Sequence, residues 1–200
     1  MSFIKLKDLV LLKEMPKTGV YLDPVFKEKL ERFLKIKLSN MEVFSDIEEN
    51  SIGGGYYILS GHLNDILDRW GCIIKKRDDG IVLCAGSTFK QISFTGKESA
   101  LQVMLTHKFE TDPPKAASKL YVFLAKKWNS IIFSDGRVTD DAKNVWYELL
   151  TRPNLKNEKV SLFVWDKLTR KEITNFGNID DLFGTDDKYE NILIGIKPIK

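Results

Sequence analysis

The chain has 200 residues, with 31 lysines and arginines against 28 aspartates and glutamates, so its formal net charge is only +3. This near balance excludes a protein whose whole surface is built to grip phosphate backbones. A hydrophobic content of 43% is too high for a disordered chain, and no apolar run approaches the roughly 18 residues of a membrane span. The N-terminus shows no signal-peptide core. We therefore expect a cytoplasmic protein with no membrane attachment, forming a single domain over residues 1–200.

The first part of the chain predicts a helix, a polar stretch and a strand. A helix is expected to begin near Asp23 and Pro24, because aspartate caps free N–H groups and proline suits the first helical position. Residues 39–50 are polar and predict loops. The glycines at 53–55 then lead into an apolar strand over residues 56–59.

Residues 62–94 are expected to form one helix followed by three strands. An apolar stripe predicts that helix over residues 62–70, with Gly71 as its C-terminal cap. Residues 72–75 and 81–84 flank an Asp-Gly turn, which is a strong hairpin signal. After Gly86 a separate third strand is expected over residues 91–94.

The second half of the chain alternates strands and helices. We expect, in order, a strand over 101–109 (with a helix as the alternative for its first residues), a helix over 115–128, a strand over 131–133, a helix over 139–151, a strand over 160–165, a short strand near 171 and a last strand over 191–196. This order predicts an α/β (α+β) fold with a mixed, largely antiparallel sheet flanked by about four helices.

The two cysteines and two histidines leave little room for a metal centre. Cys72 and Cys84 lie on opposite arms of the predicted hairpin but are not directly opposed, so buried reduced thiols are expected rather than a disulfide. His62 and His107 have no partner at ligand spacing, and no nucleophile-elbow motif is present. No metal site is predicted.

The glycine run and the lysines each carry a functional and a structural interpretation. A phosphate loop needs a strand before its glycines and a helix after them, whereas a strand follows Gly55, so a turn or a loop over a site is expected. Lysines such as Lys115 and Lys119 interleave with aromatic residues, as on nucleic-acid surfaces. Acidic residues are interspersed among the lysines, which favours a solvated surface.

The second half of the chain resembles the GNAT acyltransferase superfamily in its order of elements, which is strand, loop, helix, strand, helix and strand over residues 101–165. Its sequence is similar to the divergent, often phage-encoded members of that family over residues 118–121, 134–135 and 144–150. In that family the fourth strand splays from the fifth. The loop after the fourth strand and the next helix N-terminus hold the pyrophosphate of acyl-CoA through backbone N–H groups. The resemblance implies a GNAT-like half over residues 96–200, a variable half over 1–95, and acetyl-CoA or another acyl-CoA as cofactor.

The resemblance also implies roles for individual residues. Pyrophosphate contacts fall to Lys115, Ala116, Ala117 and Ser118. Glu110 would deprotonate the acceptor amine, and Tyr147 would protonate the leaving thiolate.

The chain departs from the family pattern at two places. The family's loop reads Arg/Gln-x-x-Gly-x-Gly/Ala, whereas Pro113 and Pro114 here remove two backbone donors. The best alignment puts Trp146, which cannot act as a general acid, where the family often carries its tyrosine. Tyr147 follows one residue later and is rotated by ~100° on the helix.

Two functions from different classes follow. The first is an acyl-CoA-dependent N-acyltransferase that acts on the amine of a small molecule or a protein. The alternative is a non-catalytic GNAT-like binding protein that engages a host protein or, less favoured by the net charge, a nucleic acid; an altered cofactor loop is expected in such a protein. A phage structural or accessory protein is a third interpretation, with no positive feature in the sequence.

Overall fold

The computed structural model describes residues 44–63, 68–77, 80–95, 98–110, 113–135, 140–153, 155–174, 178–183 and 190–199. The helix predicted to begin near Asp23 lies outside these residues. The chain divides into two compact units: Met1–Phe89 with Leu105–Ala116, and Lys90–Met104 with Ala117–Lys200.

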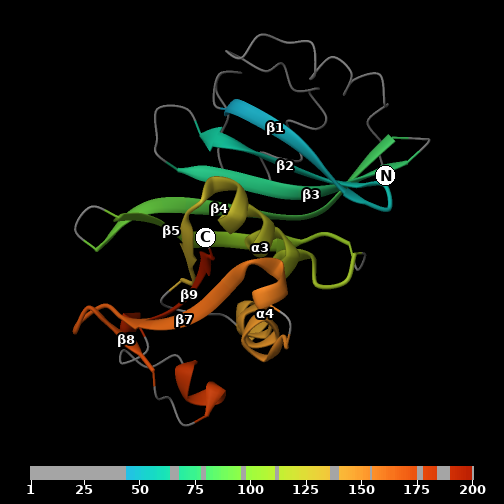
Figure 1. Cartoon of the computed structure of the whole chain (residues 1–200). Coiled ribbons are helices and arrows are strands. Elements are labelled where there is room, and N and C mark those ends of the chain that lie inside the picture. Colours follow the sequence, from blue (N-terminus) through green and yellow to red (C-terminus); the bar gives the residue numbers. More distant parts are fainter. Residues whose placement is uncertain are drawn as a thin grey trace. The chain divides into compact units, whose positions relative to one another are not determined.

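The first unit contains an antiparallel meander (Figure 1). Its strands are β1 (Phe44–Gly53), β2 (Tyr56–Leu63), β3 (Arg69–Arg77) and the first part of β4 (Gly80–Thr95), each antiparallel to the next. Strand β3 carries two β-branched residues, Ile73 and Ile74, which lie on its two faces and are both fully buried.

Two predictions for this region are wrong. Strand β1 begins within the stretch 39–50 that was expected to be loop. The helix expected over 62–70 is replaced by strand at both described ends, since His62 belongs to β2 and Trp70 to β3. Gly71 is not a helix cap but lies inside β3 opposite Ser60. Short apolar runs fit a helix face and a strand buried on both sides equally well, and here sheet pairing decided between them.

The predicted β3–β4 hairpin is confirmed. Arg77 pairs with Gly80, and Cys72 pairs with Gly86 rather than with Cys84. Both cysteines are buried thiols outside any disulfide, as expected. Burial, and after it the neighbouring Cys84, raises the pKa of the Cys72 thiol, so it stays protonated and inert.

Strand β4 is longer than the sequence predicts. The break expected at Gly86 is absent, because this buried glycine continues the ladder, and residues 91–94 belong to the same strand. Strand β5 (Glu98–Lys108) confirms the strand expected over 101–109 and excludes the helical alternative. Both strands run from one unit into the other.

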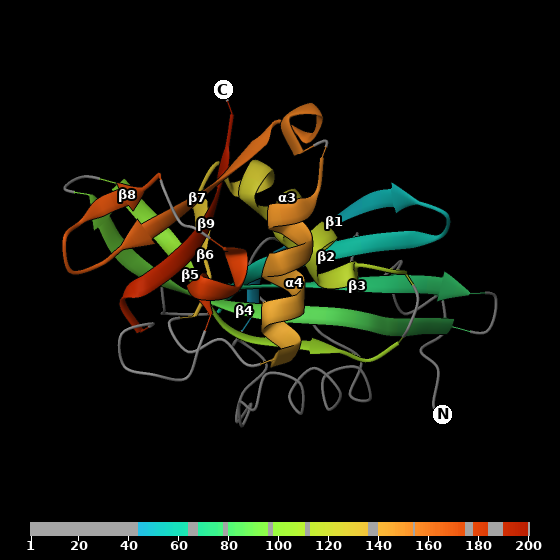
Figure 2. The same cartoon turned by 90° about the horizontal axis from the view of Figure 1, so that it is seen from below.

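The predictions for the second unit are confirmed to within a few residues. In chain order its remaining elements are α3 (Ala116–Trp128), β6 (Ile131–Phe133), α4 (Asp140–Thr151), the 3₁₀ turn η2 (Leu155–Glu158), β7 (Val160–Asp166), β8 (Lys171–Ile173), the 3₁₀ turn η3 (Ile179–Leu182) and β9 (Ile192–Pro198). Figure 2 shows α4 beside α3. None of the described helices is long and apolar enough to cross a membrane.

The strands form one sheet in the order β1-β2-β3-β4-β5-β6-β9-β7-β8. Strands β5 and β6 run parallel, whereas β6 with β9, β9 with β7 and β7 with β8 are antiparallel. The fold is therefore α+β with a mixed, mostly antiparallel sheet, as predicted. The described residues form two α-helices, those expected over 115–128 and 139–151.

Two apolar clusters hold the second unit together. Leu120 and Leu124 of α3 and Leu149 of α4 are fully buried, and the Tyr121 and Trp146 ring centroids lie 5.3 Å apart. The second cluster joins residues from strands β4 to β9: Ala100, Phe133, Phe163 and Leu193, with Ile92, Phe94, Ile131 and Trp165 packed against it. The pyrophosphate site predicted from the sequence lies at the start of α3, which packs against α4 in the first of these clusters.

Candidate functional site

The start of α3 carries the residues that the sequence assigns to pyrophosphate. Lys115 stands immediately before the helix, with its side chain exposed and a backbone φ of +60°. This left-handed conformation is uncommon for a residue with a side chain and is the one that glycine usually supplies. The chain thus reaches at Lys115 a conformation that glycines commonly provide in phosphate-binding loops.

The first three helical residues are small and buried. Ala116, Ala117 and Ser118 are 1%, 8% and 1% exposed. The N–H groups of a first helical turn have no acceptor within their own helix, and together with the helix dipole they favour an anion. Pro113 and Pro114, immediately upstream, donate no backbone N–H. The first-turn donors therefore begin after the prolines, but these residues are almost fully covered, so an anion reaches their N–H groups only if the chain around the turn opens.

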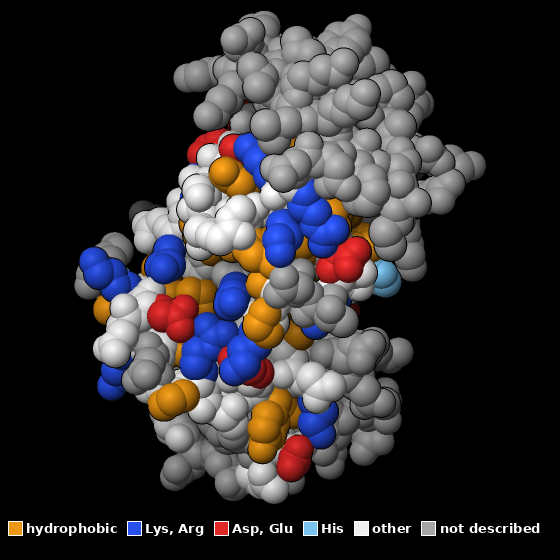
Figure 3. Space-filling model, turned by 90° about the vertical axis from the view of Figure 1, so that its right-hand side faces the viewer, with side chains coloured by type: hydrophobic (Ala, Val, Ile, Leu, Met, Phe, Trp, Pro, Cys, Tyr) orange, Lys and Arg blue, Asp and Glu red, His pale blue; other side chains and the backbone are white. Residues whose placement is uncertain are grey.

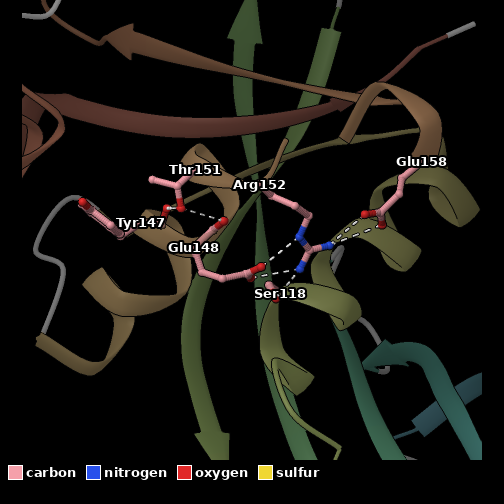
Figure 4. A network of polar contacts seen from close by, with 6 residues as sticks. All are labelled: Ser118, Tyr147, Glu148, Thr151, Arg152 and Glu158. Carbon is pink, nitrogen blue, oxygen red and sulfur yellow. Dashed lines mark hydrogen bonds and ion pairs between the residues drawn. The ribbon is translucent and has the colours of Figure 1, made fainter. Parts of the chain in front are cut away.

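A network of polar side chains lies against this first turn (Figure 4). Its centre is Arg152, which directly follows the last residue of α4. Nε of Arg152 donates to Oε1 of Glu148 and Nη2 donates to Oε2, both at 2.9 Å, so the pair is bidentate. Nη1 donates to Oε1 of Glu158 in η2 at 3.0 Å.

The same guanidinium reaches α3. Nη2 of Arg152 donates to Oγ of Ser118 at 2.8 Å, although 34 residues separate the two in sequence. The Arg152 side chain is 14% exposed and that of Glu148 is 19% exposed. Burial lowers the pKa of Arg152, but the hydrogen bonds and charges of Glu148 and then Glu158 outweigh it, so the pKa is raised. Arg152 is a permanent cation that links α4, η2 and the first turn of α3.

Local sequence places Glu148 and Arg152 one helical turn apart, at the i and i+4 spacing that suits an ion pair. Helix α4 ends just before Pro153, as expected for a residue that precedes proline. Oγ1 of Thr151 donates to the carbonyl of Tyr147 at 2.8 Å, which satisfies a carbonyl in the last turn. These local features end α4 at Thr151 and place Arg152 directly after the helix.

The other predicted site residues lie as follows. Glu110 follows β5 and is half-buried, with its backbone N–H donating to the carbonyl of Cys84 at 3.2 Å. Tyr147 is 42% exposed on α4, and its side chain points away from the Arg152 network (Figure 4). Glu110, Lys115 and Ala116 belong to the first unit, and Ala117, Ser118 and Tyr147 to the second. Lys115, Ala116, Ala117 and Ser118 are consecutive residues, so the chain itself keeps them together.

The sequence interpretation missed three members of the network, Arg152, Glu148 and Glu158. The four-residue spacing of Glu148 and Arg152 was the available signal, but it also describes an ordinary surface pair. The contact of Arg152 with Ser118 depends on how α4 packs on α3, which no local pattern reveals.

The surface carries both signs of charge. On the face in Figure 3, lysine and arginine side chains lie among hydrophobic and some acidic ones. Several described lysines pair with carboxylates, among them Lys76 with Glu49 at 2.9 Å and Lys143 with Asp180 at 3.1 Å. Within the described ranges, no three His, Cys, Asp or Glu side chains are grouped to hold a metal ion.

No protein-family model matches the chain, and no curated protein matches its sequence.

Proposed function

We propose that the chain is an acyl-CoA-dependent N-acyltransferase with a GNAT-like fold, which transfers an acyl group to the amine of a small molecule or protein. The observation that carries the proposal is the β5–α3–β6 unit. Strands β5 and β6 are parallel neighbours paired from Ala100 to Gln102 and from Ile131 to Phe133, and β5 then continues to Lys108. In the resembled family two parallel strands joined by a loop and a helix splay apart to admit the cofactor, and the short β5–β6 pairing joined through α3 supports the same arrangement here.

Polar contacts mark the point where this pairing ends. Nε2 of Gln102 donates to the carbonyl of Ser134 at 3.3 Å, directly after the last paired residue of β6. The Ser134 hydroxyl accepts the N–H of Ile194 at 3.0 Å, so β6 is committed to β9 on its other side. These contacts support a short, defined β5–β6 pairing.

In the proposed complex, the N–H groups of Ala116, Ala117 and Ser118 and the ammonium group of Lys115 hold the pyrophosphate of acetyl-CoA or another acyl-CoA. The helix dipole and the exposed Lys115 both favour negative charge at this point.

The proposed chemistry needs two proton transfers. The acceptor nitrogen attacks the thioester carbonyl, the C–S bond breaks, and an amide and CoA form. Glu110 takes the proton from the amine, and Tyr147 donates a proton to the leaving thiolate. Because Tyr147 points away from the network beside α3, its role is tested separately: Tyr147→Phe must lower kcat if it is the acid.

Binding of acetyl-CoA to the purified full chain tests the proposal. A ligand bound only by the folded state at 100 times its Kd stabilises that state by about 2.7 kcal/mol, so acetyl-CoA should raise the melting temperature. Pantetheine lacks the pyrophosphate and should raise it less. No shift at millimolar acetyl-CoA contradicts the proposal.

Variants of two exposed lysines at opposite ends of α3, Lys115 just before the helix and Lys126 in its last turn, localise the effect. Lys115→Ala should weaken acetyl-CoA binding about two- to fivefold, because it removes a charge at the anion site. Lys126→Ala removes the same charge from the other end of the helix and is the matched control. Equal effects of the two variants would show that only overall charge matters.

A second candidate function, non-catalytic binding of a host protein or nucleic acid, is favoured by one specific observation. Pro113 and Pro114 withhold two donors, and the Ser118 hydroxyl is already engaged by Arg152. A gel shift at two salt concentrations separates the partners, because phosphate-driven binding weakens steeply with salt. A host-protein partner predicts no nucleic-acid shift at either concentration.

A further inference from the structure

We propose that the β7–β8 turn, residues 166–171, binds duplex DNA, with its three cations on phosphates and Leu168 as an apolar wedge in the minor groove. The inference does not involve the acyl-CoA site. It rests on the second candidate function, for which it names the surface and the kind of nucleic acid.

The turn presents an apolar side chain among cations. Leu168 is 76% exposed, more than any other large hydrophobic side chain of the described residues. The turn contains one carboxylate and three exposed cations, which are Lys167, Arg170 and Lys171. In Figures 1 and 2 it projects from the second unit, away from α3 and α4, so a partner can reach it.

Hydrogen bonds hold the turn in one conformation. The Asp166 carboxylate accepts the N–H of Leu168 and the hydroxyl of Thr169, both at 2.8 Å. The N–H of Lys167 donates to the carbonyl of Asn191 at 2.8 Å, which fastens the turn to the chain just before β9. A loop that is already ordered loses little conformational entropy when a partner binds.

The residue choices in the turn do not serve the fold alone. Arg170 has a φ of +52°, a conformation that glycine adopts freely and that costs other residues energy. A single exposed leucine is common on protein surfaces. Here, however, Leu168 stands between cations in a turn where arginine occupies a position suited to glycine. Departures of this kind from local preference are expected at functional sites.

Duplex DNA matches both features of the turn. Lysine and arginine bind phosphates, and the planar guanidinium can bind a phosphate through two hydrogen bonds. Proteins that bind the minor groove combine such cations with an apolar wedge, leucine among others, that unstacks a base step and bends the duplex. Leu168, between Lys167 and Arg170, is placed to act as that wedge.

Two other partners fit the turn less well. The loop between the paired residues Asp166 and Lys171 has four residues, far too few for the roughly 800 Å² that each partner buries in a stable protein interface. A bilayer would receive one leucine and three cations, which is a single weak signal, whereas stable membrane association needs two.

Fluorescence anisotropy with a short DNA duplex tests the role of the cations in the purified full chain. Three phosphate contacts predict that the logarithm of the binding constant falls with the logarithm of salt concentration with a slope of about −2.7. Lys167→Gln, Arg170→Asn and Lys171→Gln should each make the slope shallower by about 0.9. Asparagine tolerates the left-handed backbone at position 170. Lys126→Ala, which removes an exposed charge from the end of α3, is the matched control and should not change the slope.

Leu168→Ala separates the wedge from the charges. It should weaken duplex binding about fivefold without changing the salt slope, because it removes an apolar contact and no charge. Energy transfer between dyes at the two ends of the duplex should report a bend with the wild-type chain and not with Leu168→Ala. Met104→Ala truncates another exposed apolar side chain and should behave as wild type.

A wild-type chain that binds the duplex, with turn variants that keep its slope and its bend, overturns this inference and leaves nucleic-acid binding elsewhere on the chain. No duplex binding at low salt overturns it together with the nucleic-acid form of the second candidate function. Binding instead to phosphatidylglycerol vesicles also overturns it and assigns the turn to a membrane surface. The turn variants should leave the acetyl-CoA shift of the melting temperature unchanged, so the outcome for the acyl-CoA site is read separately.

Discussion

In the β1–β2 hairpin of the first unit, the turn is made by Gly53, Gly54 and Gly55, with φ of +86°, +61° and +76°. In the β7–β8 hairpin of the second unit no glycine is present. There Oδ1 of Asp166 accepts the N–H of Leu168 at 2.8 Å, and Oδ2 accepts the Thr169 hydroxyl at 2.8 Å. The first turn uses the backbone freedom of glycine, whereas the second combines a side-chain cap with one non-glycine residue at positive φ, Arg170 at +52°, so the two should respond to different perturbations.

Glycine has a different purpose in the second unit. Gly195 of β9 pairs with Phe133 on one side and Phe163 on the other. A Cβ at Gly195 would lie 2.5 Å from Cε1 and Cζ of Phe163 and 2.8 Å from Cε1 of Phe133. The aromatic rings occupy the space above the glycine, so packing rather than φ requires it. A long-range contact therefore controls this region, whereas a local turn controls β1–β2.

The largest expected effect is that of Gly195→Ala. The added methyl group must displace two packed rings, and overpacking of this kind costs about 1–3 kcal/mol. Urea unfolding followed by tryptophan fluorescence measures the loss. The double variant Gly195→Ala/Phe163→Leu should recover part of it. An unchanged midpoint for Gly195→Ala would show that packing does not require glycine at this position.

Gly54→Ala should have a smaller effect of about 1 kcal/mol, because an L-residue with a Cβ is strained at positive φ. The Cβ itself meets only the Tyr56 ring at 3.5 Å, an ordinary contact. Gly54→Asn is the informative control, since asparagine tolerates the left-handed region and should cost less than alanine. Equal costs for the two substitutions would argue against a conformational origin.

The smallest effect belongs to Asp166. The Thr169 hydroxyl, and after it the N–H groups of Leu168 and Thr169, lower the pKa of Asp166. A lowered folded pKa stabilises the fold above the unfolded pKa of about 4, and this contribution is lost as pH falls through the folded value. Asp166→Asn should therefore be less stable than wild type at neutral pH, with the difference vanishing in acid.

An NMR titration of the Asp166 carboxyl carbon measures this shift directly. Thr169→Val should move the pKa upward by removing the strongest hydrogen bond. A normal aspartate pKa in the wild-type chain would show that the carboxylate does not cap the turn.

Some features of the proposed site follow from local sequence, and others depend on long-range contacts. The start of α3 near residue 115 follows from the Pro113-Pro114 break and the helical spacing after it, so Lys115 to Ser118 are recognisable as a helix start. The sequence does not reveal the left-handed backbone at Lys115 or the hydrogen bond from Arg152 to Ser118, because both depend on the tertiary structure around the helix.

The sequence by itself determined the elements that have strong local signals, namely periodicity, prolines or a turn. These elements are α3, α4, β6, β7 and the β3–β4 hairpin. Tertiary structure alone decided that residues 62–63 and 69–70 are strands, that β9 lies between β6 and β7, and that Arg152 meets Ser118. The physical reason is the separation along the chain of the residues that make each contact. Helix periods and turns involve residues a few positions apart, whereas strand pairing and the Arg152 network join residues tens of positions apart, whose contact depends on the whole sheet.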